Sequence, residues 1–248
     1  MGVDFDKMAI NALRTGRWHE SQQPPELTIK DFFDQQYSAF RRYWWRHGNR
    51  YSLDVRDHVA FHARLLGLAK ARKSGRALDL GAGEGSDAIR LALLGYEVDA
   101  VDISPVAADK IATFCRQVGA NVNVHNMDAA QYSFSHQYDV IICNGLLHYV
   151  EGKEALLARM MHATVPGGLN MISLFSTYTS TPECHRIVPV HPDDEHGTVV
   201  RVYRGWKKEF LAFDRDRLEK SHPGFEPHRH SYIKMITRKA IGGAIPVN

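Results

Sequence analysis

The stretch Leu78-Asp79-Leu80-Gly81-Ala82-Gly83-Glu84-Gly85 decides how this chain of 248 residues can fold. The apolar run that leads into it is typical of a buried strand, and a helical pattern starts directly after it, at Ser86. A strand, a tight glycine turn and a helix together bring backbone N–H groups close to a nucleotide-like ligand. The dinucleotide-binding pattern G-x-G-x-x-G is not met, because it would need glycine where Ser86 stands. A plain strand-to-helix turn without a ligand is the alternative.

A carboxylate that follows the next predicted strand supports a ligand at this turn. The strand over 97–101 ends at Asp102, about 20 residues after the glycines. A carboxylate in that position can accept hydrogen bonds from both hydroxyl groups of a ribose. We therefore predict that Asp102 binds a ribose. A helix N-cap before Pro105 is compatible with this role but does not explain the spacing.

The composition indicates an ordinary globular protein. The apolar fraction of 44% is enough for a packed core, and the formal net charge of +3 points to no nucleic-acid or membrane partner. No apolar run approaches the length of a membrane span, and the first residues contain no apolar targeting segment. The three cysteines lack paired spacing, which favours a reducing compartment over a disulfide scaffold. These features predict a cytoplasmic location.

The chain divides into two parts by its pattern. Residues 1–70 are rich in aromatic side chains and do not alternate between strand and helix, so we predict a helical cap there. Residues 71–248 do alternate, which predicts an α/β domain with a mainly parallel sheet and helices on both faces. We expect strands over 76–80, 97–101, 121–125, 138–143 and 169–174, helices over 86–95, 105–118 and 153–164, and a closing hairpin with strands over 209–213 and 231–237.

The glycine turn reads Asp-x-Gly-x-Gly-x-Gly over residues 79–85 and resembles motif I of the class I S-adenosylmethionine (SAM) methyltransferases. Later segments resemble that family in the same order: Asn126-Met127-Asp128-Ala129, Tyr138-Asp139-Val140-Ile141-Ile142-Cys143-Asn144 and Pro166-Gly167-Gly168-Leu169. The resemblance implies a Rossmann-like, seven-stranded, mostly parallel sheet with an antiparallel last strand, and SAM as the cofactor. Within the family, 94–100 and 165–170 are most similar to TehB-type tellurite-resistance and thiol methyltransferases.

For the cofactor, the resemblance implies that the glycine turn wraps the amino-acid part of SAM and that a side chain of 126–129 contacts the adenine. Asp102 would then bind the ribose of SAM. The cofactor-binding residues predicted on this basis are Asp79, Gly81, Ala82, Gly83, Asp102, Ile103, Met127, Asp128 and Asn144.

Two residues that follow the fourth predicted strand are candidate catalytic groups. Methyl transfer needs the nucleophile, the methyl carbon and the sulfur in line, and a hydroxyl or ammonium nucleophile also needs a general base. His148 can act as that base or contact the substrate, because its unperturbed pKa lies near neutrality. Packing at the start of a helix is the alternative. The Asn144 amide can orient the SAM amino group or a substrate.

Aromatic side chains of the N-terminal part can form a lid over the site. Tyr37, Phe40 and Trp44 recur at helical spacing and make one stripe. Aromatic rings attract cations by roughly 0.5–2 kcal/mol, so such a lid suits the sulfonium of SAM. Packing against the domain beneath is the alternative. The predicted lid and substrate residues are Tyr37, Tyr43, Trp44, Tyr51, Tyr149 and Tyr178.

Two groups of side chains have loose metal-ligand spacing. Cys184-His185 supplies too few ligands by itself. A second group flanks the predicted hairpin turn near the C-terminus and consists of His222, Glu226, His228 and His230. We expect no metal site from either group.

These observations favour a SAM-dependent methyltransferase that acts on a small molecule. The segment Asn144-Gly145-Leu146-Leu147 lacks the Asn/Asp-Pro-Pro-Tyr pattern of nucleic-acid methyltransferases. The alternative is a SAM lyase or cyclase, in which the SAM amino group attacks its own side chain and releases methylthioadenosine without an acceptor. The sequence indicates neither the acceptor atom nor an oligomeric state.

Overall fold

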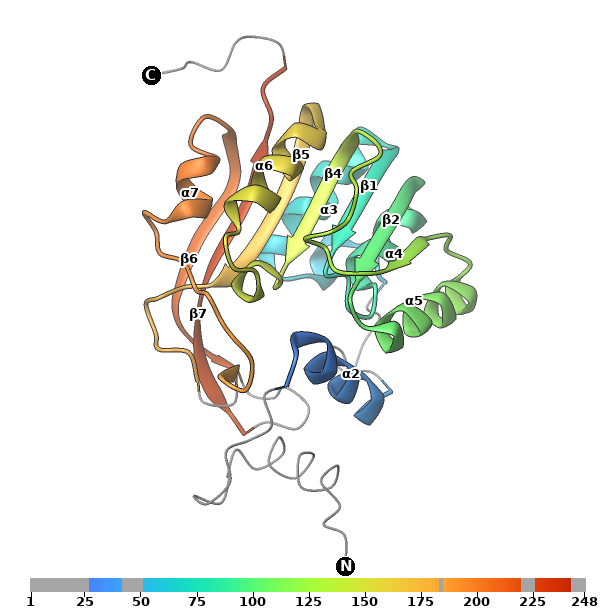
Figure 1. Cartoon of the computed structure of the whole chain (residues 1–248). Helices are drawn as coiled ribbons and strands as arrows, with labels where there is room; N and C mark the ends of the chain where they lie inside the picture. Colours follow the sequence, from blue (N-terminus) through green and yellow to red (C-terminus); the bar gives the residue numbers. More distant parts are fainter. Residues whose placement is uncertain (1–26, 42–50, 183–184, 220–225, 242–248) are drawn as a thin grey trace, which may run out of the picture.

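The computed structural model describes residues 27–41, 51–182, 185–219 and 226–241. Its strands are β1 (Gly75–Leu80), β2 (Tyr96–Asp102), β3 (Asn123–Asn126), β4 (Tyr138–Asn144), β5 (Thr164–Phe175), β6 (Lys207–Glu219) and β7 (His228–Arg238). They form a seven-stranded sheet in the order β3-β2-β1-β4-β5-β7-β6 (Figure 1). β1 to β5 run parallel, while β7 is antiparallel to both of its neighbours. The predicted α/β class and the mostly parallel sheet are confirmed.

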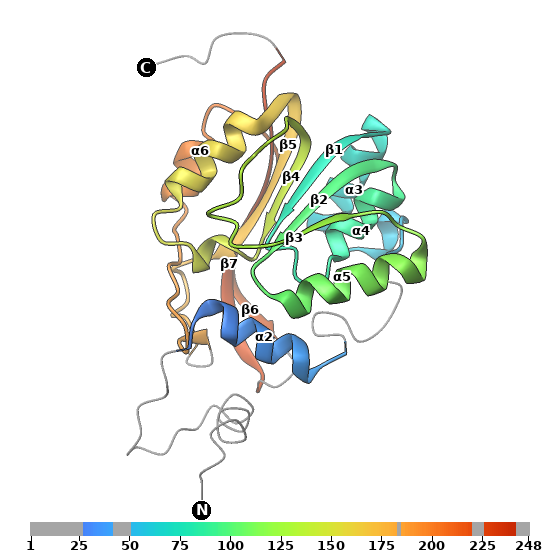
Figure 2. The ribbon, with the colours of Figure 1, turned by 45° about the vertical axis from the view of Figure 1, so that its right-hand side comes forward.

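Helices cover both faces of the sheet. One face is packed by α3 (Ala60–Arg72), α4 (Ser86–Leu93) and α5 (Pro105–Val118), and the other by η2 (Leu147–Tyr149), α6 (Glu154–Ala163) and α7 (Thr198–Val202). A short 3₁₀ turn, η1 (Val55–Asp57), precedes α3. Figure 2 shows the sheet edge-on between the two layers. Among the described helices, none combines the length and the apolar character that crossing a bilayer requires.

Local sequence explains why these elements form where they do. The inner part of β1 is mostly apolar because a parallel strand covered on both faces buries side chains on both of them, and Ala77, Leu78 and Leu80 are fully buried. α5 starts where the Ser104 hydroxyl accepts a hydrogen bond from the N–H of Ala107, with a proline in the first turn. The local sequence therefore determines both β1, which leads into the glycine turn, and α5, which follows Asp102.

The strand order reverses between β1 and β4, and this reversal creates the site. β2 lies on one side of β1 and β4 on the other. The chain leaves β1 toward α4 on one face and leaves β4 toward η2 on the opposite face. In open α/β sheets such a reversal opens a crevice beyond the C-terminal ends of the two strands.

A further helix, α2 (Ile29–Ala39), lies beyond this end of the sheet rather than on either face (Figures 1 and 2). It is fixed to the start of α5 by two polar contacts. The Ser104 hydroxyl donates to the Asp34 carboxylate, and the Lys110 ammonium donates to the carbonyl of Phe40. α2 is thus a helical, aromatic element over the crevice, and it is the part of the predicted cap that lies there.

α3 belongs to the core of the sheet, although its first residues fall within the predicted cap of residues 1–70. Phe61, Leu65 and Ala69 are buried in the same cluster as side chains of β1, β2 and β4. The predicted boundary after residue 70 therefore falls inside a helix of the sheet layer. The division of the chain into two domains stays a prediction.

Three strands are clearly longer than predicted: β5, β6 and β7, of which β7 spans His228–Arg238 instead of 231–237. β5 begins at Thr164, before the expected turn, because Thr164 already pairs with Tyr138 of β4. β6 extends beyond 209–213 to Glu219, and its outer half pairs with β7 although most of its side chains there are exposed. Such an edge strand lacks the apolar alternation on which its prediction depends. The predicted turn at Pro223-Gly224 lies outside the described residues.

Gly85 ends the glycine turn as the N-cap of α4, and Gly85→Ala is expected to destabilise the fold. Its φ is +75°, and an added Cβ would lie 2.8 Å from Cγ1 of Ile111. The left-handed conformation costs a non-glycine residue roughly 1–2 kcal/mol, and the overlap with Ile111 adds to that. Gly119→Ala is the matched control, because Gly119 has φ +70° but nothing within 4 Å of the added Cβ. Urea denaturation should show the larger loss of unfolding free energy for Gly85→Ala; equal losses would contradict the argument.

Candidate active site

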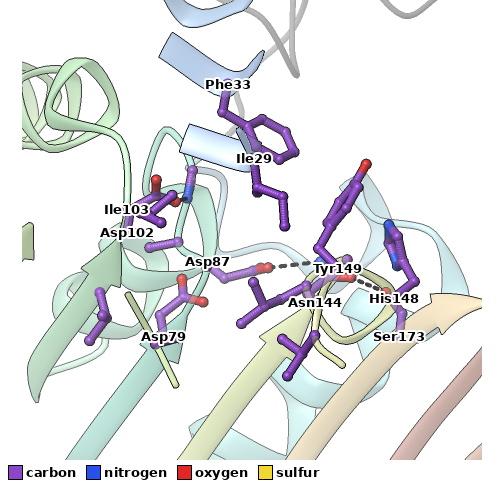
Figure 3. A pocket seen from close by; sticks show the side chains of 18 of the residues that line it. Ile29, Phe33, Asp79, Asp87, Asp102, Ile103, Asn144, His148, Tyr149 and Ser173 are labelled. Carbon is purple, nitrogen blue, oxygen red and sulfur yellow. Dashed lines mark hydrogen bonds between the residues drawn. The ribbon is translucent and has the colours of Figure 1, made fainter. Parts of the chain in front are cut away.

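One cavity of about 450 Å³ lies at the C-terminal ends of β1, β2 and β4 and reaches β5 and α2 (Figure 3). It brings together residues from nine separate segments of the chain. Those that matter for the arguments below are Ile29, Phe33, Tyr37, His62, Asp79, Gly81, Ala82, Gly83, Asp87, Asp102, Ile103, Asp128, Asn144, His148, Tyr149, Ser173, Phe175, His185 and Tyr232.

The glycine turn is tied to the end of β2. Gly81 N and Ala82 N both donate to the carbonyl of Val101, at 2.9 and 3.0 Å. Gly83 N then donates to Oδ2 of Asp102 at 2.7 Å. The turn and the carboxylate therefore form one rigid unit along the cavity wall.

The Asp102 carboxylate is buried and held by backbone donors on both oxygens. Its Oδ1 accepts from Ser104 N at 2.9 Å, in addition to the Gly83 bond to Oδ2. Burial raises the pKa of Asp102 to about 6, because desolvation outweighs the opposing effect of the two N–H donors, and the charge of Asp34 adds to the increase. Each oxygen keeps further acceptor capacity toward the cavity.

Two more carboxylates lie at the β1 side of the cavity. Oδ2 of Asp79 accepts from Ala88 N, at the start of α4, at 3.1 Å. The pKa of Asp79 is raised well above its usual value, first by burial and then by the negative charge of Asp87. Asp87 itself pairs with the Arg90 guanidinium. This corner of the cavity is buried and lined by two carboxyl groups.

Asn144 connects this acidic corner to β5. Its Nδ2 lies 3.3 Å from Oδ2 of Asp87 and 3.3 Å from Nε2 of His62. Its Oδ1 accepts from the Ser173 hydroxyl (Figure 3). With both ends of the amide engaged, Asn144 is held in one orientation at the tip of β4.

His148 is buried beside β5 and stacks on Phe175, with ring centroids 3.8 Å apart and planes inclined by 22°. Nδ1 accepts from Phe175 N at 3.4 Å, which favours the neutral tautomer that carries hydrogen on Nε2. Burial lowers the pKa of His148 to about 3, with smaller contributions in the same direction from His230 and Lys153. A ring in this state donates a hydrogen bond well and accepts a proton poorly.

α2 closes the cavity with apolar and aromatic side chains. Phe33 meets the Tyr149 ring edge to face, with centroids 5.3 Å apart, and stacks on Tyr37 at 5.8 Å. Ile29 lies beside Phe33 on the same helix face (Figure 3). The wall opposite the acidic corner is therefore largely aromatic.

Most of the site residues predicted from the sequence line this one cavity. Three of the described ones do not: Met127 packs into the core on the α6 face, Tyr51 packs against the core on the α3 face, and Tyr178 is exposed beneath the Arg215 guanidinium. The predicted lid residues Tyr43 and Trp44 lie outside the described residues.

Several cavity residues were not predicted. Asp87 could have been suspected, because it lies in the first turn of the helix that follows the glycine motif. Ile29 and Phe33 belong to the same helical face as Tyr37, so the helical spacing of the aromatic stripe could have indicated both residues. His62, Phe175 and Tyr232 lie in α3, β5 and β7 without a local motif, and only the fold brings them to the cavity.

The stability of the chain should depend on pH through His148. A histidine that is exposed on unfolding has a pKa of about 6.5, whereas that of folded His148 is about 3. Between these values only the unfolded state takes up the proton, so this group contributes stability above about pH 6.5 that is lost as the pH falls, by up to about 1.4 kcal/mol per pH unit. His148→Gln should reduce the slope of unfolding free energy against pH, measured by urea denaturation from about pH 5 to 7.5. Parallel slopes for both proteins would contradict the assignment.

Comparison with known proteins gives the family. Residues 77–168 match the family model of a methyltransferase domain. Hemagglutinin 1 of Eikenella corrodens is 31% identical over 170 residues, which is 66% of this chain and 54% of that protein. The probable S-adenosyl-L-methionine-dependent methyltransferase TehB of Haemophilus influenzae (strain 10810) is 23% identical over 185 residues, 73% of this chain and 63% of TehB. The chain therefore spans 54% of the length of the Eikenella corrodens protein and 63% of the length of TehB.

Solved structures share the fold. The crystal structure of TehB from Haemophilus influenzae aligns with a TM-score of 0.61 and 19% identity over 74% of this chain and 64% of that one. The Burkholderia thailandensis 1,6-didemethyltoxoflavin-N1-methyltransferase aligns with a TM-score of 0.58 and 18% identity over 97% of this chain and 92% of that one. Residues 77–168 are therefore a methyltransferase domain, and the seven-stranded sheet that contains them shares its fold with the SAM-dependent methyltransferases named above.

Proposed function

We propose that this chain transfers the methyl group of SAM to a small molecule by in-line displacement. The observation that carries the proposal is the single cavity that joins the glycine turn and Asp102 to an aromatic compartment under α2. Its volume of about 450 Å³ falls within the roughly 300–1,000 Å³ typical of small-molecule sites. A helix over the opening leaves little space for a macromolecular substrate. The Burkholderia thailandensis relative in fold was crystallised with 1,6-didemethyltoxoflavin and S-adenosylhomocysteine, which supports an acceptor of that size.

At the nucleotide end, Asp102 has the chemistry that a ribose requires. Two backbone N–H groups fix the orientation of its carboxylate, and the remaining lone pairs can accept from the 2′- and 3′-hydroxyls. Ile103 and Asp128 line the cavity next to it, where the adenine would lie. The Asp128 carboxylate accepts from Ala130 N at 2.8 Å, so its position is fixed before the ligand binds.

At the methionine end, the acidic corner suits a cation. The raised pKa of Asp79 reflects unfavourable burial of charge next to Asp87. The ammonium and sulfonium groups of SAM bring positive charge to this corner and would relieve that repulsion. The fixed amide of Asn144 can orient the SAM amino group through its remaining acceptor capacity.

At the acceptor end, we assign His148 a hydrogen-bonding role in place of the general-base role expected from the sequence. A group with a pKa of about 3 takes a proton poorly at neutral pH. An Nε2–H donor can instead hold an oxygen or nitrogen of the acceptor in line with the methyl group. Acceptors that are already nucleophilic without deprotonation, such as thiolates and neutral amines, fit this arrangement.

The cytoplasmic location expected from the sequence also remains a proposal. Cys115 and Cys143 are buried free thiols, as a reducing compartment would preserve them.

The identity of the product separates methyl transfer from lyase or cyclase chemistry. The purified chain should form S-adenosylhomocysteine from SAM only when an acceptor from a panel of thiols, amines, hydroxyl compounds and oxyanions is present. Mass spectrometry detects both products in one run. Methylthioadenosine formed from SAM alone would refute methyl transfer and identify a lyase or cyclase.

SAM affinity should depend on the ionisation of Asp102. Because the ribose hydroxyls donate to the ionised carboxylate, a proton must leave Asp102 when SAM binds below pH about 6. The association constant measured by calorimetry should therefore fall by up to about tenfold per pH unit below that value. Asp102→Asn should weaken SAM binding by at least about 1 kcal/mol and flatten this decrease. Other titrating groups act equally in both proteins, so identical pH profiles would refute the ribose assignment.

A further inference from the structure

Three histidine side chains converge on the side of the cavity that is formed by β5 and β7. His228 and His230 lie two residues apart on β7 and share one face of the strand. His185 comes from the segment that follows β5 and also lines the cavity. One ring nitrogen from each of the three lies within 4.8 Å of the others. The sequence alone predicts no metal site here, because it is the fold that places His185 beside His228 and His230.

The distances between these rings fit shared coordination of one ion. Nε2 of His185 lies 3.2 Å from Nε2 of His228. Two nitrogens bound at about 2.0–2.1 Å to a tetrahedral Zn²⁺ are about 3.3 Å apart. The His230 ring lies with its centroid 4.8 Å from that of His185 and 4.5 Å from that of His228. The three rings therefore need only small rotations to point one nitrogen each at a common centre.

The orientation of His228 is typical of a metal ligand. Its Nδ1 lies 2.7 Å from the carbonyl oxygen of Glu226 and must donate to it, since a carbonyl only accepts. In the neutral ring this leaves the lone pair on Nε2, the atom that faces His185. Metal-binding histidines are commonly fixed in this way, with the second ring nitrogen donating to a carbonyl.

The surroundings hold the other two ligands in place and leave access from one side. His185 and His230 are 4% and 1% exposed. The Phe175 ring stacks on His230, with centroids 4.7 Å apart, and carries His148 on its other face. Because His185 borders the cavity, a fourth ligand can approach from there. A site with three imidazoles and one open position matches the ligand set of catalytic zinc centres.

We propose that His185, His228 and His230 bind one divalent transition-metal ion of the Zn²⁺ class beside the cavity. Neutral imidazole nitrogens suit Zn²⁺, Co²⁺ and Ni²⁺ and not the hard cations Mg²⁺ and Ca²⁺, which take oxygen ligands. The site is independent of the SAM-binding end, and its existence does not depend on methyl transfer. An ion there would present its open position to a lone pair of whatever molecule enters the cavity.

The test is metal binding by the whole chain, prepared without a histidine tag and stripped with a chelator. Co²⁺ is the probe, because its visible absorption reports the coordination number, and Zn²⁺ is then added in competition. We expect one Co²⁺ per chain with the strong absorption of a four-coordinate site, displaced by Zn²⁺. His228→Gln should weaken Co²⁺ binding by about 100-fold or more, since even loss of an outer partner costs roughly 10–100-fold. His196→Gln, at a side chain that is 90% exposed, should bind as the unchanged chain does.

Two further readouts separate loss of the site from loss of the fold. His228 is the least buried of the three ligands, and His228→Gln should keep the SAM affinity of the unchanged chain. Zn²⁺ should raise the melting temperature of the unchanged chain and of His196→Gln but not that of His228→Gln or His185→Gln. If the unchanged chain binds no Co²⁺, or if His228→Gln binds it equally well, the rings form only a hydrogen-bonded histidine cluster and the proposal fails.

Discussion

The hydrogen bond from Gly83 N to the Asp102 carboxylate is the contact on which the site depends. It joins the turn after β1 to the end of β2, two segments that the sequence separates by 19 residues. Because Ser104 N holds the second oxygen, the carboxylate cannot rotate away from the crevice. The same short segment fixes the lid, since the Ser104 hydroxyl binds Asp34 of α2. The glycine turn, the Asp102 carboxylate and α2 are therefore linked through Gly83, Asp102 and Ser104.

The residues at the glycine-turn end of the cavity could be predicted because their sequence signals are local. A glycine turn must follow a strand and precede a helix, and a carboxylate at the tip of the next strand falls beside it by topology alone. Asp79, Asp102 and Asn144 all end or leave strands that the apolar pattern had located, and all line the cavity. Met127 does not line the cavity, because its side chain packs against the core on the α6 face.

The cavity residues that come from α3, β5 and β7 were harder to predict because no local sequence pattern connects them. Phe175 and Tyr232 face each other across β5 and β7. His62 reaches Asn144 from α3, across 82 positions of sequence. The environment of His148 was also not predictable from the sequence: its residue type suggests a base, whereas its burial against Phe175 lowers its pKa. The full length of β6 was not predicted either, because an exposed edge strand carries no apolar alternation.

The two outer strands of the sheet affect whether copies of the chain can aggregate with one another. An open sheet exposes unpaired N–H and C=O groups along its outer strands, and these can recruit a strand from another molecule. Here one outer strand, β3, has only 4 residues. The other, β6, carries the run Asp214-Arg215-Asp216-Arg217, with Arg215 and Asp216 mostly exposed. A second chain that docked there would have to desolvate those charges, so the sheet resists aggregation by strand addition at both of its margins.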